Sequence, residues 1–405
     1  MSLRLPSRAG WSLLGPAFVA AIAYVDPGNI AANVSAGARF GFLLVWVIVV
    51  ANVMAGLVQY LSAKLGLVTG RTLPEAVRDR TNSPGRIAYW VQAELVAIAT
   101  DVAEIIGGAI ALHLLFGLPL VLGGVITGLA SLVLLTIGDR RGQRMFERVI
   151  TGLLLIITIG FLASLVVNPP PSAAVADGLI PRFDGVDSVL LATAMLGATV
   201  MPHAVYLHSG LARDRHGHPD AGPRRARLLR ATRWDVGIAM LVAGSVNLAL
   251  LLVAATNLLG RDGTDTIEGA HAAVADTLGP AVALFFAVGL LASGLASTSV
   301  GAYAGAMIMQ GLLRTTFPLL ARRLVTLVPA LLVLASGVNP TRALVLSQVV
   351  LSFGIPFALV PLVRLTSDRA VMGQDTNSRL TTTLAWSVAA LIIVLNAALI
   401  VLTVS

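Results

Sequence analysis

The chain has 405 residues, of which 57% are hydrophobic and only 12% are charged, and its formal net charge is +8. A soluble domain usually carries about a quarter of charged residues, so this composition excludes an ordinary soluble enzyme or binding domain. The sequence contains no cysteine, which also excludes disulfides and metal sites built from thiolates.

The apolar residues form long uncharged blocks, among them 40–63, 149–176 and 236–260. A helix needs about 20 such residues to cross a bilayer core of about 30 Å. We therefore predict an all-α integral membrane protein with a single transmembrane domain over 1–405. The first apolar run lacks a small-residue cleavage site, so we interpret it as a span and not as a signal peptide. The eleven predicted spans are 13–37, 42–63, 88–114, 119–137, 148–167, 188–210, 236–257, 280–312, 324–338, 343–363 and 382–403.

The basic residues are distributed asymmetrically between the predicted loops. With the N-terminus in the cytoplasm, the outside segments hold only Arg39, Arg182, Arg261 and Arg342 of the 28 basic residues. The positive-inside rule accounts for this asymmetry, so we predict no nucleic-acid partner despite the positive charge. We take 211–235, which is rich in arginine, as the longest loop and place it inside. An odd number of spans then leaves the C-terminus outside.

Two predicted spans look interrupted near their centres. The first contains Asp26-Pro27-Gly28-Asn29, and the sixth contains Met201-Pro202-His203. Proline removes a backbone donor and clashes with the preceding turn, so a helix tends to open at such a place. Laying Pro27 on Pro202 places Ala23 on Ala198 and Asp26 on Met201. Matching breaks in two halves indicate an inverted-repeat transporter, with repeats at about 11–167 and 187–364 and an extra helix at about 382–403.

The residues at these breaks have the chemistry of a cation site. A carboxylate at the bilayer centre is costly and usually functional, although Asp26 could instead be satisfied by nearby backbone donors. Asp26 and Asn29 would offer the oxygen ligands that Mg²⁺, Ca²⁺ and Mn²⁺ prefer. The soft thioether of Met201 would favour transition metals, the alternative being core packing. His203 could bind metal or relay a proton, or be a satisfied core histidine.

A row of carboxylates follows one face of the third span. Glu94, Asp101 and Glu104 are spaced by seven and three residues, which places them on one helical face. This row predicts a proton path with Arg322 or Arg323 of span nine as a partner, the alternative being structural ion pairs. In span ten, Gln348 could add an amide oxygen to the cation site or make only an interhelical hydrogen bond. His208 and His113 are weaker candidates, and Ser347 and Ser352 flank Gln348.

Together, Asp26-Pro27-Gly28-Asn29 and Met201-Pro202-His203 resemble the two signature motifs of the Nramp family of divalent metal transporters. The similarity covers the whole chain and is typical of the prokaryotic manganese transporters of this family. It implies a LeuT-type fold of five plus five helices with one extra helix, in a bacterial plasma (inner) membrane. It also implies import of Mn²⁺, Fe²⁺ and similar ions with proton cotransport.

The resemblance also assigns roles to residues at matching positions. The implied metal ligands are Asp26, Asn29, Met201, the carbonyl groups of Ala23 and Ala198, and Gln348 in one state. The implied proton route is His203, Asp101, Glu104 and Arg323, to which the carboxylate row adds Glu94 and Arg322.

Other functions remain as alternatives. A LeuT-type sodium-coupled carrier of small solutes would share the broken helices. A metal-gated channel would differ from a carrier because its metal uptake would not saturate. A membrane-embedded enzyme is not expected, because the chain has neither His-Glu-x-x-His nor a nucleophile elbow. We expect no bound cofactor, lipid as the surrounding partner, and a monomer.

Overall fold

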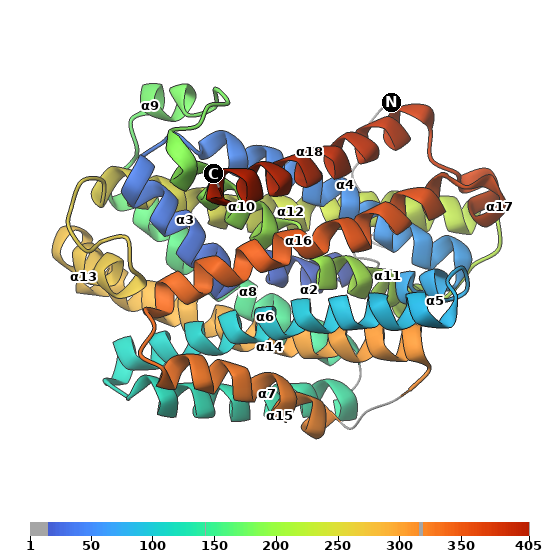
Figure 1. Cartoon of the computed structure of the whole chain (residues 1–405), viewed down its shortest axis with the longest axis horizontal. Helices are drawn as coiled ribbons and strands as arrows, with labels where there is room; N and C mark the ends of the chain where they lie inside the picture. Colours follow the sequence, from blue (N-terminus) through green and yellow to red (C-terminus); the bar gives the residue numbers. More distant parts are fainter. Residues whose placement is uncertain (1–14, 142, 316–318, 405) are drawn as a thin grey trace.

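The computed structural model describes residues 15–141, 143–315 and 319–404, and this part of the chain is helical throughout apart from its loops (Figure 1). Within these residues, seven helices are long and apolar enough to cross a membrane, with the α10–α11 pair counted as one, and four shorter apolar helices accompany them. Each of the eleven predicted spans coincides with a helix or a broken pair of helices. The elements of the first half are α2 Pro16–Ile22, η1 Ala23–Val25, α3 Pro27–Phe40, α4 Val45–Thr69, α5 Leu73–Arg78, α6 Ser83–Phe116, α7 Leu120–Arg141, α8 Gln143–Val167 and α9 Ser172–Asp177. Those of the second half are α10 Gly185–Thr199, α11 Pro202–His216, α12 Pro223–Asn257, α13 Ile267–Leu278, α14 Pro280–Leu313, α15 Leu319–Ala335, α16 Pro340–Ser367, α17 Arg369–Met372, η2 Gly373–Asp375 and α18 Arg379–Val404.

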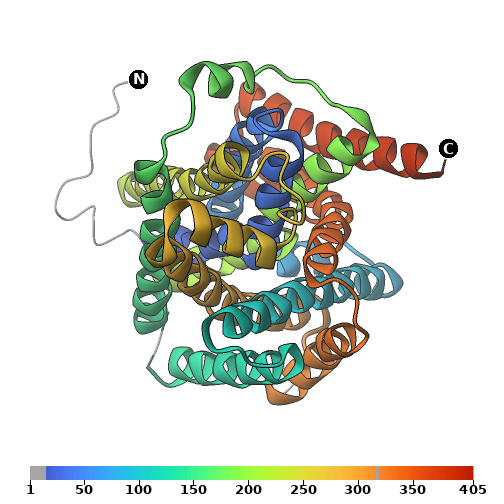
Figure 2. The ribbon, with the colours of Figure 1, turned by 90° about the vertical axis from the view of Figure 1, so that its left-hand side faces the viewer.

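The long helices run roughly side by side, and their loops collect at two opposite ends (Figures 1 and 2). The short helices α9 and α13 lie at one end, whereas α5 and α17 lie at the other. At the α9 end, Arg39 pairs with Asp187, so the ends of α3 and α10 are held together. At the α5 end, Arg225 bonds to Asp375 at 3.0 Å across the predicted inside loops. The loops therefore separate into the two groups that the charge pattern predicts.

The prediction of a long loop over 211–235 is wrong. Helix α11 continues to His216 and α12 begins at Pro223, so only 217–222 connects them. Arginine, alanine and leucine are good helix formers, and proline is well placed in the first turn of α12. The charged segment is thus a helical extension beyond the apolar core, which hydropathy alone cannot distinguish from a loop. The short helices α5, α9, α13 and α17 were likewise not predicted.

Both predicted interruptions are present. The chain leaves α2 through the 3₁₀ turn η1, becomes extended at Asp26 with ψ 168°, and restarts as α3 at Pro27. In the second case α10 ends at Thr199, Met201 is extended with ψ 123°, and α11 restarts at Pro202. Asp26 and Met201 are therefore equivalent N-cap residues, each followed by proline at the first helical position, where its missing N–H costs nothing.

Glycine lets other helices come close to the breaks. A Cβ added at Gly107 of α6 would lie 2.0 Å from the Cβ of Pro27. A Cβ at Gly197 of α10 would lie 2.0 Å from the carbonyl oxygen of Gln348 in α16. Only glycine permits this backbone approach, so α6 and α16 can enclose the two breaks.

Candidate metal-binding site

The two breaks meet at the side chain of Asn29, which is completely buried. Its amide Nδ2 donates to the carbonyl oxygen of Ala198 at 2.7 Å and to Oδ1 of Asp26 at 3.1 Å. The backbone N–H of Asn29 also donates to Oδ1 of Asp26 at 2.6 Å, which caps α3. One residue of the first break therefore bridges its own carboxylate and a carbonyl group freed at the second break.

Gln348 approaches the same carboxylate from α16. Its Nε2 donates to Oδ2 of Asp26 at 3.4 Å, and its side chain is fully buried. The side chain lies directly against Gly28, where an added Cβ would fall 1.8 Å from Nε2 of Gln348. Glycine at position 28 therefore makes room for Gln348 beside Asp26.

The amide side chains that contact Asp26 leave buried acceptors without partners. Oδ1 of Asn29 and Oε1 of Gln348, the amide oxygens of the two side chains that contact Asp26, are buried and have no hydrogen-bond partner among the described residues. Buried polar atoms are nearly always satisfied, so such a group needs an explanation. A carboxylate surrounded by buried, unsatisfied acceptors is the arrangement that a cation stabilises.

Met201 is fully buried at the N-cap of α11, three residues after Ala198. Ala23 is also fully buried and forms the first residue of the 3₁₀ turn that precedes Asp26. The structure thus places every residue of the predicted metal site at or beside the two breaks.

Two side chains at the first break were not predicted from the sequence. Asn247 of α12 donates to the carbonyl oxygen of Tyr24 at 2.7 Å, and Ser293 of α14 donates to that of Val25 at 2.5 Å. Both are buried polar residues within apolar spans, and that was the available signal. They satisfy two carbonyl groups that the interrupted helix frees, as the bilayer requires.

Of the predicted proton residues, His203 directly follows the second break in α11, and Asp101 and Glu104 lie on α6. Nδ1 of His203 is 3.4 Å from the hydroxyl of Thr100, and Asp101 is close enough to act on His203 electrostatically. One turn further along α6, Glu104 accepts a hydrogen bond from Ser297 at 2.5 Å. Asp101 and Glu104 are buried, whereas Glu94 is only half-buried. The side chains of Arg322 and Arg323, in α15, lie outside the described part of the structure.

The remaining candidates have structural environments. His208 is fully buried and bonds to the amide oxygen of Gln59 at 2.7 Å. Ser352 exchanges two hydrogen bonds with Asn396 of α18, which fastens the extra helix to α16. His113 is exposed at the end of α6 and bonds to the carbonyl oxygen of Leu118. Of these polar residues, none contacts Asp26 in a hydrogen bond that the structure records.

Known proteins with a similar sequence form one family. The Nramp family, described as natural resistance-associated macrophage protein-like, matches residues 17–402. The chain is 70% identical over 402 residues to the divalent metal cation transporter MntH of Mycobacterium tuberculosis (strain CDC 1551 / Oshkosh), covering 99% of this chain and 94% of that protein. It is 48% identical to the divalent metal cation transporter MntH of Bacillus subtilis (strain 168), covering 96% of this chain and 91% of that one.

Solved structures of similar proteins have the same fold. The manganese transporter of Eremococcus coleocola superposes with a TM-score of 0.85 at 32% identity, covering 97% of this chain and 87% of that one. MhsT in complex with L-phenylalanine superposes with a TM-score of 0.62 at 14% identity, which is a likeness of fold alone. The predicted fold class, a LeuT-type helical membrane protein, is confirmed. With the family match spanning nearly its whole length, the chain belongs to the Nramp family.

Proposed function

We propose that this chain imports divalent transition metal ions such as Mn²⁺ and Fe²⁺ with protons, by alternating access around its two broken helices. It is a transport protein and not an enzyme, as its relatives are named divalent metal cation transporters. The observation that carries the proposal is the convergence of Asp26, Asn29 and the Ala198 carbonyl group where the breaks meet.

The hydrogen bonds of Asn29 indicate how a cation would be held. Its Nδ2 lies 2.7 Å and 3.1 Å from two oxygen atoms, those of Ala198 and Asp26. Rotating the amide by half a turn would place Oδ1 there, so that three oxygen atoms converge at the separations that ligands of one metal ion adopt. Gln348 donates to Asp26 in the same way and could turn its own oxygen inward. Both amides would thus exchange a donor for a ligand when metal arrives.

The proposed proton route begins beside the metal ligands. A proton leaving Asp26 or His203 would pass to Asp101 and Glu104 on α6. Two carboxylates buried on one face of a membrane-spanning helix are rarely only structural, which supports such a role. We place the α5 end of the bundle in the cytoplasm, in a bacterial plasma membrane, and propose a monomer. An interior-negative potential would then favour import by about 2.3 kcal/mol per charge per 100 mV.

Uptake into liposomes containing the purified protein tests this function. Mn²⁺ and Fe²⁺ should enter saturably, acidify a trapped pH dye, and enter faster with an inward proton gradient. Na⁺ or amino-acid gradients should not affect uptake, which separates the proposal from a sodium-coupled carrier. Linear, unsaturable uptake would indicate a channel and overturn the carrier assignment.

Glu104→Gln is expected to slow metal-coupled proton entry by about tenfold, the lower part of the range for proton transfer by a positioned side chain. The amide can still accept the hydrogen bond from Ser297, so packing is retained. The trapped dye reports proton entry while Mn²⁺ uptake is followed in parallel. Glu268→Gln, in the short loop helix α13, is the matched control. Proton entry equal to that of the control would remove Glu104 from the route.

Gly28→Ala is expected to reduce Mn²⁺ uptake by about tenfold or more. The added methyl group would overlap Nε2 of Gln348 and force that side chain away from Asp26. Gly152→Ala is the control, because a Cβ at Gly152 meets no atom within 4 Å. Initial uptake rates normalised to the amount of folded protein give the comparison. Equal rates in the two variants would show that Gln348 need not stay beside Asp26.

A further inference from the structure

A cavity of about 350 Å³ lies between α5, α6 and α16, away from the breaks and at the end of the bundle where the arginine-rich segments gather. The cavity lining has a polar, positively charged side and an apolar side. Arg80, Thr81 and Tyr89 contribute polar groups on the α5–α6 side, and Arg364 adds a second guanidinium group from α16. Val77 and Val360 contribute apolar surface.

The cavity carries an excess of positive charge. Arg80 pairs with Asp368 at 3.5 Å, and both of these residues line the cavity. Arg364 is exposed, and no carboxylate pairs with it in the described part of the chain. Asp368 also accepts a hydrogen bond from the backbone of Ala370, which caps α17. The cavity lining therefore holds two guanidinium groups and only one carboxylate, that of Asp368.

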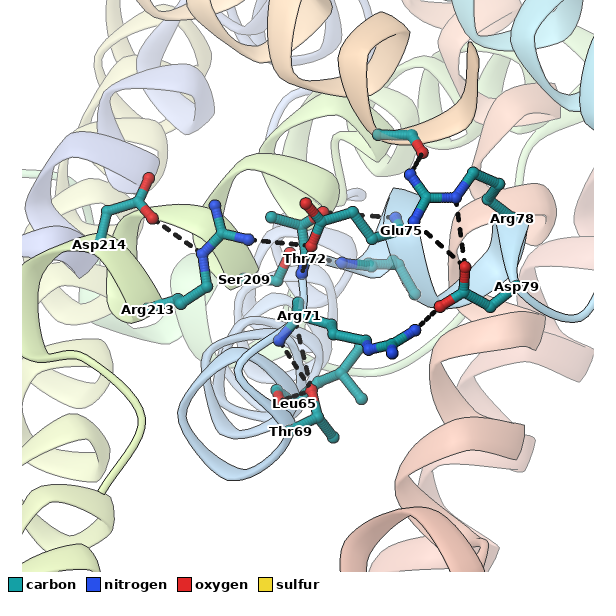
Figure 3. A network of polar contacts seen from close by, with 12 residues as sticks. Leu65, Thr69, Arg71, Thr72, Glu75, Arg78, Asp79, Ser209, Arg213 and Asp214 are labelled. Atoms are coloured by element: carbon teal, nitrogen blue, oxygen red, sulfur yellow. Dashed lines mark hydrogen bonds and ion pairs between the residues drawn. The ribbon is translucent and has the colours of Figure 1, made fainter. Parts of the chain in front are cut away.

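The neighbouring carboxylates are already engaged, as Figure 3 shows. Glu75 of α5 accepts from Arg213 of α11 at 2.9 Å and closes a capping box with Thr72. Asp79 is shared between Arg71 and Arg78. These contacts fix α5 in place and leave no further acidic side chain of that helix to neutralise the cavity.

An apolar surface leads from the cavity along the outside of the bundle. Tyr89 packs edge-on against Phe357, with ring centroids 6.3 Å apart, and Phe357 is 46% exposed. On α16, Phe353 and Val350 are also exposed, one and two turns before Phe357 on the same helical face. Tyrosine with adjacent exposed apolar residues is typical of the depth where lipid headgroups meet acyl chains. The cavity therefore opens at the level of the headgroups.

We propose that this cavity binds the phosphate group of an anionic phosphate ester, with Arg80 and Arg364 as its charged partners. Guanidinium groups match phosphate oxygens in shape and charge, and the hydroxyl groups of Thr81 and Tyr89 can donate to the remaining oxygens. The apolar side, formed by Val77, Val360 and the surface beyond Phe357, favours a phospholipid over a soluble ester. Bound phosphate would connect α5, α6 and α16 and stabilise this end of the bundle.

Thermal unfolding of the purified full-length protein in detergent tests the site. Phosphatidylglycerol should raise the unfolding midpoint by several degrees, whereas phosphatidylcholine should raise it much less. The double variant Arg80→Gln/Arg364→Gln should lose this difference. Arg369→Gln/Arg379→Gln, which removes two exposed arginines outside the cavity, should keep it. An equal response of the two double variants would overturn the proposal.

Glycerol 3-phosphate distinguishes the two sources of phosphate. If glycerol 3-phosphate at millimolar concentration leaves the unfolding midpoint unchanged, the ligand is a lipid. If it raises the midpoint and the Arg80→Gln/Arg364→Gln variant loses that rise, the ligand is a soluble ester at the same site. Native mass spectrometry of the unmodified protein provides a test that needs no variant. It should show phosphatidylglycerol bound about tenfold more tightly than phosphatidylcholine, and equal affinities would contradict the proposal.

Discussion

Asp26→Ala is expected to abolish Mn²⁺ uptake, with a loss of at least about 100-fold. Removing a residue that only orients a metal ligand commonly costs 10–100-fold in affinity, so removing the charged ligand itself should reach or exceed that range. Asp26 is completely buried and is approached by both amide side chains of the site. Initial rates of Mn²⁺ uptake into liposomes at several metal concentrations provide the measurement.

Asp26→Asn removes the negative charge of Asp26 but keeps the size of its side chain. Asparagine is as good an N-cap as aspartate, so α3 should still begin at Pro27. The variant should therefore unfold near the wild-type temperature but transport as poorly as Asp26→Ala. Asp177→Asn is the control for a lost carboxylate, because Asp177 pairs with Arg182 at the exposed end of the short helix α9. Near-normal uptake by Asp26→Asn would show that the carboxylate charge does not hold the metal.

We predicted both breaks from their prolines, and the breaks are present, but proline alone does not distinguish these two places. Pro329, Pro356 and Pro361 all lie inside continuous helices. What distinguishes Pro27 is Asp26, whose side chain caps the new helix, and the glycine and asparagine that follow. Met201 offers no side-chain cap, so the local signal for the second break is Pro202 alone, and its correspondence with the first break adds weight to it.

The partners of the site were harder to predict than its ligands. Asn29 and Ala198 are 169 residues apart, and Asn247 lies 223 residues from Tyr24. A single sequence carries local preferences, but it does not state which distant helices meet. Asn247 and Ser293 are ordinary polar residues in apolar spans, and their role as donors to freed carbonyl groups depends on packing. The same holds for the cavity, because α5 was expected to be part of a loop.

Met201→Ala is expected to change which metals are transported more than how fast manganese enters. A thioether binds soft transition metals and interacts poorly with Ca²⁺ and Mg²⁺, whose ligands are oxygen atoms. Without it, a water molecule could take the vacated position, and water suits the hard ions at least as well. The ratio of Ca²⁺ uptake to Mn²⁺ uptake should rise about tenfold, which corresponds to about 1.4 kcal/mol of lost discrimination.

A ratio of uptake rates is independent of how much protein folds, which matters because Met201 is fully buried. Met195→Ala on α10 removes another methionine that is almost completely buried, and it provides the matched control. Both substitutions should lower stability through the space that they leave in the core. If selectivity reflected only looser packing, Met195→Ala would change the ratio as well. If the uptake ratio changes in Met201→Ala alone, the sulfur atom of Met201 at the second break is the group that discriminates between the metals.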